Sequence, residues 1–171
     1  DEQTVYGFGR KPAYYRWATP LEYHVFASPL EAQPLNRETG EPEDPEYTEK
    51  CLIPNTSINY RWTVDSPLLG RAMVMAGKTL FVAGPPDLLD AEAAFREPNN
   101  PDIQRQLAEQ EASFQGERGG LLTAVSTENG HTVARLPLSA SPVFDGMAAT
   151  SLGLYMATTD GCVECFAPSQ D

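Results

Sequence analysis

The sequence has few basic residues, few cysteines and histidines, and no long apolar run. Its 12 Lys and Arg stand against 24 Asp and Glu, which gives a net charge of -12 at pH 7. A nucleic-acid interface needs clustered Lys and Arg to replace phosphate counterions, so nucleic acid is not an expected partner. No apolar run approaches the ~20 residues of a membrane span. The first ten residues lack the pattern of a signal peptide, which we expect to be absent or already removed.

The three cysteines are an odd number, so at least one is free or pairs with another chain. Cys162 and Cys165 form a CxxC in an alternating run, where residues three apart point to opposite faces of a strand. A disulfide would require that strand to bend, and one CxxC supplies only two of the four ligands of a structural zinc site. We predict two half-buried structural thiols, and the sequence leaves the redox state of Cys51, Cys162 and Cys165 open.

Motifs that identify common enzymes are also missing. No serine lies in a G-x-S-x-G elbow, and no glycine-rich phosphate loop occurs. The acidic segment 33–49 has three prolines but lacks the alternating Asp and Asn of a calcium loop, so it is expected to be an exposed connector. From its own residues the sequence assigns no catalytic residue, no cofactor and no metal ligand.

The sequence does contain short apolar runs separated by turns, and these repeat. Ser141 to Phe166 has a Ser-Pro entry and two Asp-Gly turns between its apolar runs, as expected for successive antiparallel strands. Segments 73–83 and 147–157 align at a spacing of 74 residues, whereas 119–125 and 160–166 align at 41. The difference places an insertion of 33 residues between the two segments of the first copy. Without it the unit is about 41 residues long, within the ~40–50 of one propeller blade.

Strands are also predicted over 4–8, 21–27, 58–64, 121–126 and 131–136, and in the last copy over 147–151, 154–158 and 162–166. Gly7-Phe8-Gly9 is expected to bend the chain at the end of the first of these. In the insertion, Asp90 can cap a short helical turn over 91–95, and Asn100-Pro101 opens a helix near 101–114. We expect this segment to lie on a face or rim of the sheets.

The predicted fold class is therefore all-β, with about three blades' worth of four-stranded antiparallel sheets of a β-propeller. A small helical insertion is expected near 85–118. We divide the partial propeller into an irregular blade over 1–65 with the acidic loop 33–49, a repeat over 66–138 that contains the insertion, and a last repeat over 139–171.

Two pairs of segments resemble a known family. SPVFDGMAATSLGLYMATTDGCVECF and GGLLTAVSTENGHTVA are similar to repeats of quinoprotein-like (PQQ-binding-like) β-propellers. VYGFGRKPAYYRWATPLEYHVFA and AMVMAGKTLFVAGPPDLLD resemble the C-terminal portion of large propeller proteins of planctomycete-type bacteria. The resemblance covers nearly the whole chain and implies a periplasmic or cell-surface location. PQQ and calcium are implied as cofactors by this resemblance alone.

The chain departs from that family in several places. It has no adjacent Cys-Cys pair, and the family's calcium ligands and catalytic Asp match no motif here. After Gly130, where the family has a Trp between blades, this chain has Val133, Ala134 and Arg135, while Trp62 is expected to keep that role in the preceding blade. A closed ring of seven or eight blades needs roughly 300 residues or more. The remaining blades are therefore expected in the same polypeptide or in a partner chain.

One stretch of the sequence offers a candidate ligand surface. Arg10, Tyr14 and Trp17 lie in a basic, aromatic segment that would form a wall for an anionic ligand or a sugar. Glu22 and His24 are two apart on a predicted strand, so they share a face and would supply two metal ligands or an acid/base pair. For both groups the alternative is structural, with aromatic residues packed between blades.

The favoured function is a non-catalytic propeller portion that serves as a scaffold or binding surface in a larger protein or assembly, with the helical insertion as a feature for partner docking. The alternative is the C-terminal part of a PQQ- and calcium-dependent quinoprotein oxidoreductase whose active site lies mostly outside this chain. A carbohydrate-binding propeller is a minor alternative. The fold by itself does not choose among them.

Overall fold

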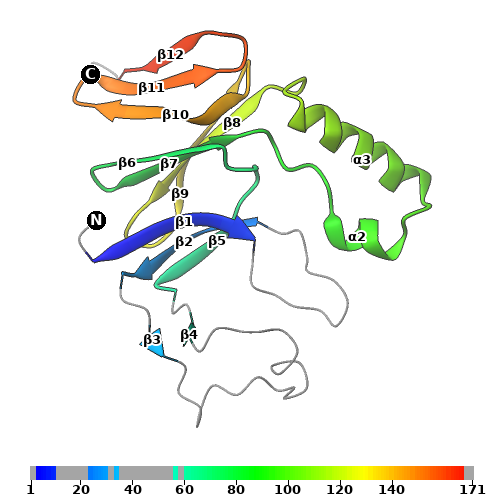
Figure 1. Cartoon of the computed structure of the whole chain (residues 1–171), viewed down its shortest axis with the longest axis horizontal. Coiled ribbons are helices and arrows are strands. Elements are labelled where there is room, and N and C mark those ends of the chain that lie inside the picture. The colour runs from blue at the N-terminus through cyan, green and yellow to red at the C-terminus, as the bar shows by residue number, and fades with distance from the viewer. Residues whose placement is uncertain (1–2, 11–22, 31–32, 35–55, 58–59, 168–171) are drawn as a thin grey trace.

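Three antiparallel sheets make up most of the structure, and they stack one above another with two helices at their side (Figure 1). The computed structural model describes residues 3–10, 23–30, 33–34, 56–57 and 60–167. We refer to the sheets in chain order as the first, middle and last sheet. The protein is therefore mostly β, as the alternating sequence predicts.

The first sheet has three described strands in the order β1-β2-β5. These are β1 (Thr4–Arg10), β2 (Tyr23–Pro29) and β5 (Trp62–Asp65), and a separate short pair joins β3 (Gln33–Pro34) to β4 (Thr56–Ser57). The expected bend at Gly7-Phe8-Gly9 is wrong, because β1 continues in register with β2 as far as Arg10. A Cβ at Gly7 would lie 2.4 Å from the Phe26 ring, so this glycine provides room for an aromatic side chain within a strand.

The middle sheet is a four-stranded meander, and the last sheet has three described strands. The strands are β6 (Ala72–Ala76), β7 (Thr79–Gly84), β8 (Gly120–Ser126) and β9 (Thr132–Leu138), followed by β10 (Pro142–Thr150), β11 (Gly153–Thr158) and β12 (Val163–Phe166). Only the middle sheet therefore has the four strands that were predicted for each blade among the residues described here.

Strand pairing in the two sheets keeps the spacings of the sequence repeat. Leu80 pairs with Met75 and Val125 in the middle sheet, and the residue 74 positions later, Leu154, pairs with Ala149 and Phe166 in the last. Each residue of the β6–β7 hairpin thus has its structural counterpart 74 positions later, in the β10–β11 hairpin. Each residue of β8 has its counterpart 41 positions later, in β12.

The first Asp-Gly of the last repeat does not form the predicted turn. Asp145 and Gly146 lie inside β10, where the register with β11 shifts between Pro142 and Met147. Asp145 has a φ of 53°, and its N–H donates to the Arg71 carbonyl at 3.0 Å. Because this N–H bonds to the residue just before β6 and not within a hairpin of its own, the chain bends at this point and continues as one strand.

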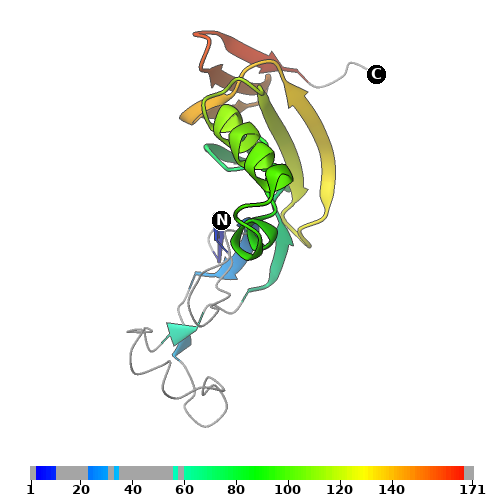
Figure 2. The same ribbon diagram turned by 90° about the vertical axis from the view of Figure 1, so that its right-hand side faces the viewer.

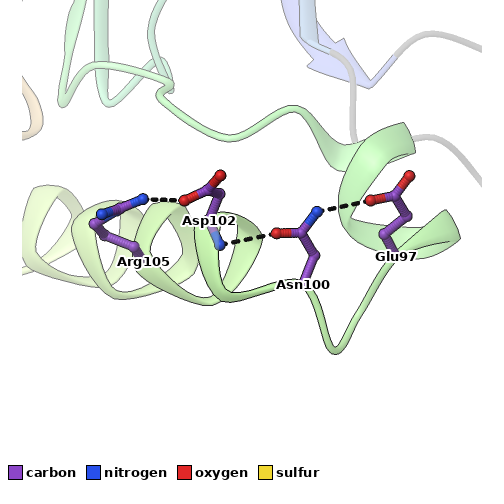
Figure 3. Close-up of polar contacts among 4 residues, drawn as sticks. All are labelled: Glu97, Asn100, Asp102 and Arg105. Carbon is purple, nitrogen blue, oxygen red and sulfur yellow. Dashed lines mark hydrogen bonds and ion pairs between the residues drawn. The ribbon is translucent and has the colours of Figure 1, made fainter.

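The insertion between β7 and β8 forms two helices, α2 (Ala91–Arg96) and α3 (Pro101–Phe114), beside the sheets (Figure 2). Both predicted N-caps are confirmed: the Asp90 carboxylate accepts from Ala93 N–H, and the Asn100 side chain accepts from Asp102 N–H at 2.9 Å. Asn100 also donates to Glu97, and Asp102 pairs with Arg105 (Figure 3). These contacts fix the turn between the helices.

Two buried side chains anchor α3 to the chain that leaves β7. The Gln110 amide oxygen accepts from the N–H groups of Leu88 and Leu89, and the Ser113 hydroxyl donates to the Pro86 carbonyl at 2.8 Å. The helix is therefore fixed at the rim of the sheets, where the sequence places it.

Apolar clusters fill the spaces between successive sheets. The first–middle interface contains Val25, Leu68, Leu80, Val82 and Val125. The middle–last interface contains Ala83, Leu122, Leu138, Leu154 and Met156. The middle sheet contributes to both clusters because successive side chains of a strand point to opposite faces, so it is covered on both sides.

Candidate functional site

Of the five residues predicted to form a ligand surface, the structure describes Arg10 and His24. Tyr14, Trp17 and Glu22 lie outside the described residues. Arg10 is exposed at the end of β1, whereas His24 in β2 is only 2% exposed. In the register of this hairpin Arg10 lies opposite Tyr23, the neighbour of His24, so the two candidates are on opposite faces of the sheet.

His24 is part of an aromatic cluster inside the first sheet. Its ring centroid lies 5.0 Å from that of Phe26 and 5.4 Å from that of Tyr60, and its Nδ1 lies 2.7 Å from the Thr63 hydroxyl oxygen. These contacts are those of a packed histidine. Within the ranges that the structure describes, no group of three or more His, Cys, Asp or Glu side chains is close enough to hold a metal ion.

The last sheet presents an apolar face to solvent. Residues on the other side of this sheet, such as Leu154, Met156 and Phe166, pack in the middle–last interface. The alternating residues point the opposite way, and we call them the last-sheet outer face: Ala148, Tyr155, Ala157, Val163 and Cys165. Val163 is 68% exposed.

Each residue of the last-sheet outer face has a counterpart that is packed in the middle sheet. By the spacings of 74 and 41, the counterparts are Val74, Phe81, Ala83, Leu122 and Ala124. Leu122 and Ala124 are 6% and 8% exposed. The same strand positions are therefore covered by a neighbouring sheet in one copy and open in the other.

Cys162 and Cys165 are free and exposed, so the prediction of half-buried thiols is wrong. As the alternation along the strand predicts, Cys165 lies on a single face of β12, the last-sheet outer face. That face has no covering element among the described residues, and this is why the thiol meets solvent.

A groove of about 400 Å³ lies between the middle and last sheets. Its walls are almost entirely apolar, with Phe81, Leu122, Ala134 and Leu136 from the middle sheet. The last sheet supplies Leu154 and Phe166 among others. Leu136 is 43% exposed, so the groove opens to solvent beside β9.

Arg71 links three elements at the other side of this interface. Its guanidinium donates to the Ser141 hydroxyl at 3.2 Å and to the Phe114 carbonyl at the end of α3, and it lies 5.5 Å from the centre of the Phe144 ring. Sequence reasoning did not single out Arg71, because its partners are 43 and 70 residues away.

The groove also escaped sequence reasoning, although a signal for it was present. At the spacing of 74 residues, Leu136 is the counterpart of Trp62 in the sequence repeat. The smaller side chain at an equivalent position indicates a difference in packing.

The chain matches no protein-family model, and neither the curated proteins nor the solved structures give a match to it. No helix in the described part of the chain is long and apolar enough to cross a membrane.

Proposed function

We propose that this chain is a non-catalytic portion of a PQQ-like β-propeller that serves as a scaffold or binding surface in a larger protein or assembly. Its partners are the remaining blades, in the same polypeptide or in a partner chain, and its location is the periplasm or the cell surface. The resemblance of the repeats motivates the family and the location.

The observation that carries the proposal is the contrast between equivalent positions in the middle and last sheets. Leu122 is 6% exposed, while its counterpart Val163 is 68% exposed. Burial of apolar area contributes about 25 cal/mol per Å². A strand with apolar residues on both faces is therefore stabilised further when another sheet covers the face that is still exposed to solvent.

A second partly open apolar position lies on β6, an edge strand of the middle sheet. Met73 and Met75 of β6 point toward the first sheet but are 38% and 39% exposed. The first sheet ends at β1 in the described residues. The last-sheet outer face and the edge strand β6 of the middle sheet thus both provide an apolar surface that another strand or sheet can cover.

The test compares two charged substitutions in the native protein, after its intact mass shows whether further blades lie in the same polypeptide. Val163→Lys places a charge on the last-sheet outer face, and Val133→Lys places one on the 66% exposed Val133 of β9 as a control. In a native protein whose outer face is covered, Val163→Lys should cost about 2 kcal/mol or more, because it buries an unpaired charge. Val133→Lys should change the stability by less than about 0.5 kcal/mol.

The readout is the free energy of unfolding, or the dissociation constant where the covering sheet comes from a partner chain. Equal effects of the two substitutions would mean that the last-sheet outer face is uncovered in the native protein, and the scaffold proposal would then be wrong.

A further inference from the structure

A buried hydroxyl on β8 faces the apolar interface between the first and middle sheets. Thr123 is only 4% exposed. Leu121 and Val125, the next residues on the same face of this strand, both pack in the first–middle interface. The Thr123 Oγ1 atom has no hydrogen-bond partner among the residues that the structure describes. Because a buried hydroxyl without a partner loses its hydration for nothing in return, a bound molecule that pairs with it would stabilise the fold.

A small cavity lies beside this hydroxyl. Thr123 and Val82 are among the residues that line it from the middle sheet, and Asp65 and Ser66 line it from the end of β5. Its volume is about 10 Å³, close to the ~10–15 Å³ that one water molecule requires. The Ser66 hydroxyl donates to the Leu68 carbonyl at 2.8 Å and accepts weakly from the Leu68 N–H at 3.4 Å, which leaves one lone pair of its oxygen for a further donor. The residues that line the cavity thus bring hydroxyl groups from both of its sides.

The sequence repeat places a direct polar contact at the equivalent point of the next interface. Glu164 is the counterpart of Thr123, 41 positions later, and Ser139 is the counterpart of Asp65, 74 positions later. The Ser139 hydroxyl donates to the Glu164 carboxylate at 3.3 Å and so joins β12 to the end of β9. A threonine oxygen lies nearer to its main chain than a glutamate oxygen does. The same link at the first–middle interface therefore needs a small polar molecule between the two elements.

We propose that this cavity binds a single buried water molecule, which pairs with the Thr123 hydroxyl and links β8 to the end of β5. Water suits the site because it both donates and accepts, and a buried water makes about three hydrogen bonds. An apolar occupant would leave the hydroxyl unpaired, and a cavity of about 10 Å³ has no room for a larger polar ligand. The proposal concerns an interface within this chain, so it does not depend on the scaffold function.

The direct test is oxygen-17 magnetic relaxation dispersion of the native protein, which detects waters with long residence times and is insensitive to the exchange of hydroxyl protons. Thr123→Val keeps the shape of the side chain and removes the hydroxyl, so it should lower the dispersion amplitude by about one water. Thr158→Val is the matched control. The Thr158 hydroxyl is also buried but donates to the Asp160 carboxylate at 2.6 Å, so its removal should leave the amplitude unchanged.

Stability measurements provide a second readout. With a water bound, Thr123→Val should lower the folded-to-unfolded ratio about fivefold, because it removes a hydrogen bond to that water. Without a water, the same variant would replace an unpaired buried hydroxyl with a methyl group and raise the ratio. Val82→Ile adds a methylene group at the cavity wall and should displace the water. In that background Thr123→Val should become neutral or stabilising.

An unchanged dispersion amplitude in folded Thr123→Val would overturn the proposal, and so would a higher stability of this variant than of the native protein. If Thr123→Val does not fold, Val82→Ile decides the matter, because it leaves the hydroxyl in place and only reduces the space beside it. A loss of about one water from Val82→Ile would then support the site, whereas an unchanged amplitude would contradict it.

Discussion

The first–middle and middle–last interfaces share strand pairing but differ in packing. At the first, the Trp62 indole covers Gly130, and a cavity lined by Val25 and Val82 among others measures only about 10 Å³. At the second, Leu136 takes the place of Trp62 and a groove of about 400 Å³ remains. The two interfaces thus repeat the same strand pairing, while the side chains on their outer strands differ in size.

This difference predicts an uneven distribution of stability. A closed interface gains dispersion contacts and removes apolar area from water, while a groove leaves its lining atoms without partners on one side. The first–middle interface should therefore depend strongly on its outer-strand side chain, and the middle–last interface should depend on it weakly.

Trp62→Ala should have the largest effect. It removes the indole from the first–middle interface together with its hydrogen bond to the Thr127 carbonyl, and we expect a loss of about 3 kcal/mol of unfolding free energy. Leu136→Ala is the matched change at the other interface and should cost about 1 kcal/mol or less, because Leu136 is already 43% exposed. Equal losses in chemical denaturation would contradict the comparison.

Gly130→Ala should cost about 2 kcal/mol, of which about half comes from its φ of 75° and the rest from contact with the indole. Gly77→Ala is the control, since Gly77 has a φ of 58° but a Cβ there meets nothing within 4 Å. In a Trp62→Ala background the cost of Gly130→Ala should fall to that of Gly77→Ala. A double-mutant cycle with no coupling would show that the indole does not press on Gly130.

Features of the fold that depend on local chemistry could be predicted from the sequence. Helix α3 begins and ends where the Asn100-Pro101 cap and the apolar spacing place it. The Asp160-Gly161 turn joins β11 to β12 as expected, and Trp62 does pack between two sheets. In each case the determining residues are neighbours in sequence or are related by the repeat.

Features that depend on what lies across an interface could not be predicted in this way. Gly7 predicts a bend, and this is wrong because the glycine accommodates the Phe26 ring of the neighbouring strand. The Asp145-Gly146 pair predicts a turn, and this is wrong because the Asp145 N–H bonds to a carbonyl 74 residues earlier in the chain. Alternation along β2 does not say whether the face that carries His24 is packed or exposed, and this side chain is only 2% exposed. Its predicted partner Glu22 lies outside the described residues, so the pair stays a prediction.

Arg71→Met should cost about 1–2 kcal/mol, because it removes the donors to Ser141 and Phe114 and the contact with the Phe144 ring while keeping most of the side-chain length. If the groove weakens the middle–last interface, this polar junction holds a larger share of its stability. Arg135→Met on the exposed side of β9 is the control and should change the unfolding free energy by less than about 0.5 kcal/mol. Similar values for the two variants would mean that Arg71 does not join the sheets.

The smallest effects concern two carboxylates with opposite pH dependence, one beside the first–middle interface and one in the exposed turn between β11 and β12. Burial raises the pKa of Asp87, whose N–H bonds to Pro67 beside the first–middle interface, above its ordinary value of 3.8, and the Leu89 N–H opposes this in part. Hydrogen bonds, first from the Thr158 hydroxyl and then from the Cys162 N–H, lower the pKa of Asp160 in the last sheet.

Because the folded state disfavours the ionised form of Asp87, this residue destabilises the protein above its raised pKa, and the penalty disappears as the pH falls through that pKa toward 3.8. Asp87→Asn should therefore stabilise the protein slightly at pH 7 and lose this advantage in acid. Asp160 stabilises the protein above 3.8, and its contribution is lost as the pH falls through the lower folded pKa, so Asp160→Asn should destabilise at pH 7 and become neutral in acid. Unfolding curves at several pH values measure both differences. If the stability differences of both variants changed in the same direction with pH, the opposite pKa shifts of buried Asp87 and exposed Asp160 would be contradicted.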